Sequence, residues 1–196
     1  LHERGFSAWG AGNRVFLDFM AEGNTGIQDA LNAPFTMIHW DRISFITYRY
    51  QASQVDYIAM INRYSALAQR YFPGRAGLDM GLMGDHRRIP ENARRAELFG
   101  GGAYFMSYLV GMKSALDLQE AVSAALARGV THINLYSLDG AVESVAGLDL
   151  WLACVQNARP AEGLAAWTPV RSVKMGMTSH LLNHVYKWLV KPPKDS

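Results

Sequence analysis

The chain has 196 residues, of which 49% are apolar and 18% are charged, and its formal net charge at pH 7 is +2. This composition is typical of a globular domain with its own core, and it excludes extensive disorder. The small charge gives no strong field for nucleic acid or an anionic membrane, and no apolar stretch reaches the roughly 18 residues of a membrane span.

The first predicted unit is faint. It consists of a short strand over residues 5–10 and a short helix from Thr25 to Leu31, which Pro34 ends. The chain begins at Leu1 without the basic segment and apolar run of a signal peptide. We therefore expect a trimmed chain or a domain from a longer protein.

The second unit is clearer. An apolar run over residues 43–48 has strand length, and the apolar residues over 55–72 recur on one face of a 3.6-residue helix. Pro73-Gly74 is expected to end this helix. Residues 76–84 then form a third mostly apolar run, which predicts the next strand.

The following units repeat this order. A helix is predicted over residues 114–128, with Ser114 as its N-cap and Gly129 as its end. A strand over residues 130–137 and a helix over 142–156 follow. Strands that alternate with helices of this size predict an α/β fold with a parallel sheet, in the form of a partial or half (β/α)-barrel.

Residues 1–158 are expected to form this barrel-like domain, and residues 159–196 an irregular segment with an amphipathic C-terminal helix near 175–190. The single cysteine, Cys154, lies in an apolar stretch and is interpreted as a small core residue, since one cysteine cannot form an internal disulfide. No metal or cofactor motif is found: His180 and His184 have a ligand spacing but lack a third ligand.

Three predicted strand ends carry Tyr48-Arg49, the glycine-rich segment 77–84 and Tyr136. This order resembles the second half of the barrel in chitinase-like glycoside hydrolases. There, a strand of the form hydrophobic–x–Met–x–Tyr–Asp precedes a strand ending in G-x-P-x-x-G, and the last strand ends in Trp followed by an acid. Here Tyr48 takes the tyrosine place, Arg49 stands where that family carries Asp, and Tyr136 stands near the last-strand Trp.

The resemblance covers roughly residues 5 to 150, and the family's catalytic D-x-x-D-x-D-x-E run is absent from the 196 residues. It implies the C-terminal half of a (β/α)8 barrel, since a full barrel needs about 250 residues. A half barrel has two unpaired sheet edges. We therefore expect a missing upstream half, self-association of two copies, or an open sheet.

Functional side chains of parallel α/β folds gather at the C-terminal ends of the strands. Applied to the predicted strands, this rule selects a polar and aromatic set suited to a sugar, whose rings stack and whose hydroxyls need donors and acceptors. The candidate substrate-binding residues are Trp9, Tyr48, Arg49, Gln51, Asp85 and Tyr136. The same rule also selects Asn13, His86, Ser137 and Glu143.

Two acids are candidate catalytic residues. Asp139 follows an apolar strand, where loss of water could raise its pKa, although Asp139-Gly140 also has the pattern of a turn that caps the next helix. Asp79 lies in the middle of a strand and would need a partner such as Arg49, so a structural ion pair is an equal interpretation. Glycosidases need two suitably spaced carboxyl groups.

Three functions follow from these residues. The first is a carbohydrate-active, glycoside hydrolase-like barrel domain or fragment of one. The second is a degenerate barrel that binds a glycan or a protein without catalysis. The third is an α/β enzyme acting on an anionic small molecule, with Arg49, His86 and Arg87 as anchors.

Overall fold

The computed structural model describes residues 2–24, 28, 33, 35–49, 54–81, 114–136 and 147–161. Within them, four strands form one sheet in the order β1-β2-β3-β4, and every neighbouring pair is parallel. The strands are β1 (Trp9–Asn13), β2 (Arg42–Ile46), β3 (Ala76–Gly81) and β4 (His132–Tyr136). The predicted α/β class with a parallel sheet is confirmed.

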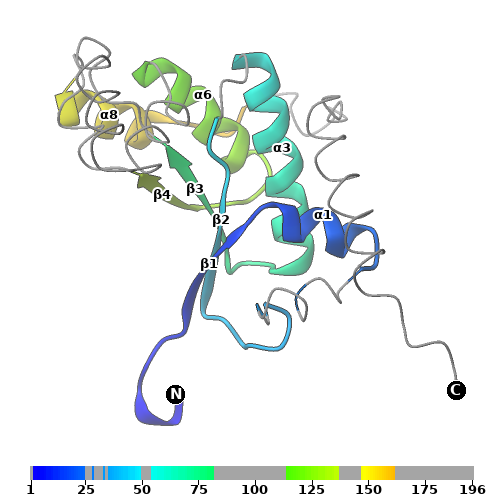
Figure 1. Cartoon of the computed structure of the whole chain (residues 1–196). Coiled ribbons are helices and arrows are strands. Elements are labelled where there is room, and N and C mark those ends of the chain that lie inside the picture. Colours follow the sequence, from blue (N-terminus) through cyan, green and yellow to red (C-terminus); the bar gives the residue numbers. More distant parts are fainter. Residues whose placement is uncertain are drawn as a thin grey trace, which may run out of the picture.

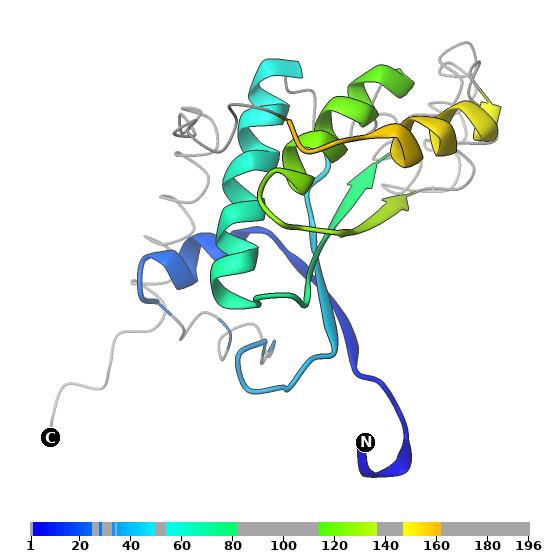
Figure 2. The ribbon, with the colours of Figure 1, turned by 180° about the vertical axis from the view of Figure 1, so that it is seen from behind.

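The helices follow the strands in chain order. After a 3-10 turn, η1 (His2–Arg4), they are α1 (Val15–Ala21), α3 (Gln54–Tyr71), α6 (Ala115–Leu126) and α8 (Gly147–Asn157). Each helix packs against the next, and they follow one another across the molecule on one side of the sheet (Figures 1 and 2). None of the helices in the described part of the chain is both long and apolar enough to cross a bilayer.

The sequential strand order explains this single helical layer. Right-handed crossovers that all step in the same direction place their helices on the same face of the sheet. A doubly wound sheet reverses its direction and carries helices on both faces. Successive units of a (β/α)-barrel have the same order as β1-β2-β3-β4, and the partial barrel itself stays a prediction.

The core lies between the sheet and the helices. Alternate residues of β2 and β3 point into it, and Ile43, Phe45 and Leu78 are fully buried there. They meet apolar side chains from α3, α6 and α8, among them Tyr57 and Leu118. The same alternation sends the remaining strand residues to the opposite face.

The first unit differs from its prediction. The strand runs from Trp9 to Asn13 rather than over residues 5–10, and a helix that was not predicted, α1, follows directly. The Asn13 side chain accepts the Val15 backbone N–H at 3.1 Å and turns the chain into that helix. The predicted helix from Thr25 to Leu31 falls almost wholly outside the described residues.

Aromatic neighbours explain why β1 contains glycines. A Cβ atom on Gly10 would lie 2.8 Å from the Trp40 ring, and one on Gly12 would lie 2.9 Å from the Phe35 ring. The two rings take the space that strand side chains normally fill on the helical side. β1 therefore lacks the apolar pattern by which a strand is recognised in sequence.

The later units agree with their predictions to within a few residues. Ser114 caps α6 by accepting the Asp117 N–H at 3.1 Å, and Gly74 and Gly129 adopt φ values of 69° and 79° after α3 and α6. Cys154 is partly buried against the core, as expected. The predicted C-terminal helix lies outside the described residues.

Gly77→Ala is expected to lower the free energy of unfolding by about 1–3 kcal/mol, as overpacking does. A Cβ atom there would lie 2.6 Å from Cδ2 of His132 and 3.0 Å from the His132 carbonyl oxygen. Denaturant titration measures the effect, and His132→Ala in the same background should relieve part of it. Equal stability of Gly77→Ala and the wild type would contradict this close packing.

Candidate functional site

The face of the sheet opposite the helices is polar, and we call it the polar sheet face. Parallel register brings its side chains into rows across the strands. The strand residues that point to it are Trp9, Ala11, Asn13, Arg42, Ser44, Ile46, Gly77, Asp79, Gly81, His132, Asn134 and Tyr136.

Asp79 lies near the centre of the polar sheet face and is 8% exposed. One carboxylate oxygen accepts a hydrogen bond from the Asn134 amide at 2.7 Å, and the Asp79 carbonyl accepts from the N–H and hydroxyl of Thr47. Glycines stand two positions before and after it on β3, at 77 and 81. The carboxylate and amide therefore form a fixed polar pair with no larger β3 side chain beside it on this face.

Two tyrosines stack at the C-terminal end of the same face. The rings of Tyr48, which follows β2, and Tyr136, the last residue of β4, have centroids 5.4 Å apart and an interplanar angle of 21°. Tyr136 pairs in register with Gly81, which carries no side chain. Tyr136 is 48% exposed, so part of this aromatic surface faces solvent.

Arg49 is engaged elsewhere. Its guanidinium donates to the Asp117 carboxylate at 2.8 Å, and the two side chains are 10% and 23% exposed. Gln54 donates to the Asp117 carbonyl and to the Glu120 carboxylate, which strengthens the same junction. The expected pairing of Asp79 with Arg49 is thus wrong, because Arg49 ties the end of β2 to the first turn of α6.

Trp9, Arg42 and His132 form the opposite end of the polar sheet face. Trp9 is the first residue of β1, so its prediction at a C-terminal strand end is wrong: the strand begins four residues later than expected. The Arg42 guanidinium lies 5.8 Å from the centroid of the Trp9 ring and donates to Nδ1 of His132 at 2.9 Å. Burial and Arg42 lower the pKa of His132, and the Asp79 carboxylate opposes them.

The sequence rule missed Arg42, His132 and Asn134. They do not lie at C-terminal strand ends, so only the alternation of polar and apolar residues in R-I-S-F-I and H-I-N-L-Y could have indicated them. Of the residues predicted from the rule, Tyr48 and Tyr136 come together, and Asn13 ends β1 as expected.

Other predicted residues lie outside the part of the chain that the structure describes. They are Gln51, Asp85, His86, Arg87, Ser137, Asp139, Glu143, His180 and His184. Within the described ranges, no group of three or more His, Cys, Asp or Glu side chains is placed to hold a metal ion.

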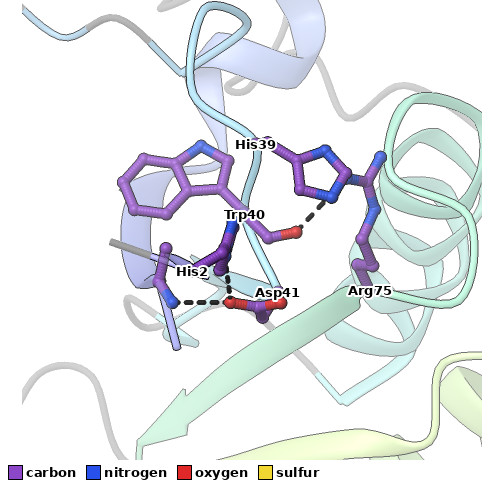
Figure 3. Close-up of polar contacts among 6 residues, drawn as sticks. His2, His39, Trp40, Asp41 and Arg75 are labelled. Atoms are coloured by element: carbon purple, nitrogen blue, oxygen red, sulfur yellow. Dashed lines mark hydrogen bonds and ion pairs between the residues drawn. The ribbon is translucent and has the colours of Figure 1, made fainter. Parts of the chain in front are cut away.

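A second polar cluster lies beside the N-terminal ends of the strands (Figure 3). The Asp41 carboxylate accepts from the Ala8 N–H at 2.6 Å and from Nε2 of His2 at 2.7 Å. Arg75 donates to the Trp40 carbonyl at 3.2 Å. These bonds fix the segment before β1 to the segment before β2, at the N-terminal end of the sheet.

The hydrogen bonds to the Asp41 carboxylate predict that this group titrates at a low pH. The bond from Ala8, and then that from His2, lower the pKa of Asp41 below its ordinary 3.8. Because the folded-state pKa is depressed, the stabilisation is present above pH 3.8 and is lost as pH falls through the folded-state pKa. The Ala8 amide proton shift, followed by NMR, should change with a midpoint below 3.8, and Asp41→Asn should abolish that change. A midpoint at or above 3.8 would contradict the bond.

The fold and this face define an α/β protein with a parallel sheet, helices on one side and polar and aromatic side chains on the other. Comparison with protein-family models, curated proteins and solved structures found no match.

Proposed function

We propose that this chain binds a carbohydrate on the polar sheet face. The observation that supports the proposal is the stacked pair of Tyr48 and Tyr136 in the row next to the hydrogen-bonded pair of Asp79 and Asn134. A sugar ring presents apolar C–H groups on its faces and hydroxyls around its edge. It is bound best where an aromatic surface adjoins fixed donors and acceptors.

Each side chain has a role in this proposal. Tyr136, half exposed, supplies the stacking surface, and the partly buried Tyr48 ring stacks against it. The Asp79 carboxylate accepts from sugar hydroxyls, and the exposed Asn134 amide offers both a donor and an acceptor. The Asn134 amide nitrogen donates to the Asp79 carboxylate at 2.7 Å, so both side chains are oriented before a ligand binds.

The engagement of Arg49 supports a sugar over an anionic small molecule at this end of the sheet. An anion anchored by Arg49 would compete with the Asp117 carboxylate, which is already 2.8 Å from the guanidinium. The tyrosines and the Asp79–Asn134 pair supply no cation to hold an anion there, whereas their aromatic surface and polar groups suit a sugar.

Hydrolysis of the bound sugar is a second candidate function, and it is favoured by Asp79, a nearly buried carboxyl group on the proposed binding face. Of the residues in the four described strands, Asp79 is the one acid. A glycosidase needs a second carboxyl group, and the proposal assigns this role to Asp139, which follows β4 in the sequence. Without that second group the same face binds a glycan but does not cleave it.

Binding is tested with neutral oligosaccharides, chito-, cello- and xylo-oligosaccharides among them, and with a Tyr136→Ala variant. Loss of the stacking surface is expected to weaken binding about tenfold or more. Leu116→Ala is the matched control, because Leu116 is a large apolar side chain, 62% exposed, on α6. Equal affinity of Tyr136→Ala and the wild type, or no binding to any neutral or acidic oligosaccharide, would refute the proposal.

Catalysis is tested separately. Asp139→Asn should abolish release of reducing sugar from whichever oligosaccharide binds, because the amide cannot act as an acid or a base. Hydrolysis that persists in Asp139→Asn would reject the assignment of Asp139, and no hydrolysis by the wild type would reject the catalytic candidate while the binding result stands.

A further inference from the structure

Arg42 is an exposed cation on the polar sheet face that has no carboxylate partner in the described part of the chain. The ion pairs there use the carboxylates of Asp18, Asp41 and Asp117. The contacts of the Arg42 guanidinium are instead with the Trp9 ring, at 5.8 Å, and with Nδ1 of His132, at 2.9 Å. Neither contact neutralises its charge.

The two neighbours hold the guanidinium in place. The Trp9 and His132 rings meet edge to face with centroids 6.1 Å apart, and Arg42 touches both. His132 is itself fixed, because its Cδ2 atom rests against Gly77, where a Cβ atom would lie only 2.6 Å away. An arginine so positioned keeps further N–H donors for a ligand, since a guanidinium has five.

His132 adds a second donor. With Nδ1 accepting from Arg42, the neutral ring carries its proton on Nε2. The exposed indole of Trp9, at 66% exposure, lies beside them as a stacking surface. A cation, a neutral N–H donor and an aromatic face are together the groups that bind a sugar bearing an anionic substituent.

Asp79 is the one carboxylate that the described strands place on this face. The Arg42 guanidinium reaches His132, which lies one row from Asp79, and the Asp79 carboxylate acts on the pKa of His132 from there. An anion in direct contact with Arg42 is closer to that cation than to Asp79, so the attraction exceeds the repulsion. A linear ligand along the face would thus meet the tyrosines and the Asp79–Asn134 pair at one end and the Arg42 cation at the other.

We propose that the glycan bound on the polar sheet face carries a carboxylate, as a uronic acid does, and that Arg42, with His132 and Trp9, binds this acidic sugar unit. The inference rests on the proposed function and specifies its ligand class. The planar fork of the guanidinium matches a carboxylate with two parallel hydrogen bonds, which favours this anion over others.

The test compares binding of oligogalacturonate, its fully methyl-esterified form, dextran and dextran sulfate. The wild type is expected to bind oligogalacturonate about tenfold more tightly than the ester, a difference of about 1.4 kcal/mol. Arg42→Gln should bring this ratio close to one. Arg70→Gln is the matched control and should keep the ratio, because Arg70 lies over the ring of Tyr71 in the same kind of pair on α3.

The outcomes separate the two proposals. Equal affinity of the wild type for the acid and its ester would overturn the acidic-ligand inference while carbohydrate binding stands. Binding to none of the four would overturn both. A preference for dextran sulfate over oligogalacturonate would overturn the carboxylate assignment.

Discussion

Asp18→Ala is expected to lower the free energy of unfolding by about 3–5 kcal/mol, the cost of removing one partner from a buried charge pair. Asp18 is 4% exposed on α1. Its carboxylate accepts from the Arg63 guanidinium at 2.7 Å and from the Tyr64 hydroxyl at 2.5 Å, and both partners lie on α3. A loss of this size is a large share of the stability of an ordinary domain, about 5–15 kcal/mol.

The cost arises from the groups that remain. Without the carboxylate, the Arg63 side chain, 25% exposed, loses the counter-charge that α1 supplies, and the buried Tyr64 hydroxyl loses its acceptor. Burial, and then the Asp18 charge, raise the pKa of Tyr64, which shows how closely the two groups are coupled. The junction of α1 and α3 should therefore open first.

Denaturant unfolding measures this effect, with Asp149→Ala as the control. Asp149 is an exposed acid in the first turn of α8, where its loss should cost only about 0.3–1 kcal/mol. Replacing the whole cluster, with Asp18→Leu, Arg63→Met and Tyr64→Phe together, should restore much of the lost stability, because no buried charge is then left unpaired. A loss below 1 kcal/mol for Asp18→Ala alone would contradict a tightly paired cluster.

Trp151→Ala is the second large effect, with an expected loss of about 3–5 kcal/mol from the cavity it leaves. Trp151 is 1% exposed and is the buried residue of α8. Its ring holds α8 in the core that α6 and the sheet share. Amide hydrogen exchange of the Trp151→Ala variant should show that α8 loses protection before α3 and α6 do.

The residues on either side of Trp151 provide the control. Leu150 and Leu152 are 48% and 42% exposed, so Leu150→Ala and Leu152→Ala should each cost far less. Comparable losses for all three variants would mean that α8 does not dock through the indole of Trp151.

The sequence was sufficient for the central units because local signals and burial agree there. Periodic apolar residues mark α3 and α6, and Ser114 and Gly129 mark the ends of α6 with the conformations expected of them. The prediction of β1 failed because the space on its helical side is filled by the rings of Trp40 and Phe35 rather than by side chains of the strand itself. Packing of this kind depends on tertiary contacts and leaves no local pattern in the sequence of the strand.

The same difference applies to the site. The rule of strand ends placed Tyr48 and Tyr136 at the same end of the sheet because β2 and β4 were predicted to end near their true ends. It could not find the pairing of Asp79 with Asn134, since that requires the register of two strands separated by 50 residues of chain (from 81 to 132). Trp9 was assigned to the wrong end because the boundary of a short strand was misplaced.

The most direct test of a carbohydrate-binding polar sheet face is the mapping of amide chemical shifts by NMR during titration with the oligosaccharide that binds best. The side-chain amide of Asn134 and the backbone amides of Gly81 and Tyr136 are expected to shift most, with the α3 and α6 amides nearly unchanged. Shifts concentrated on the helical layer, with the Asn134 side chain unaffected, would contradict the assignment of the ligand to this face.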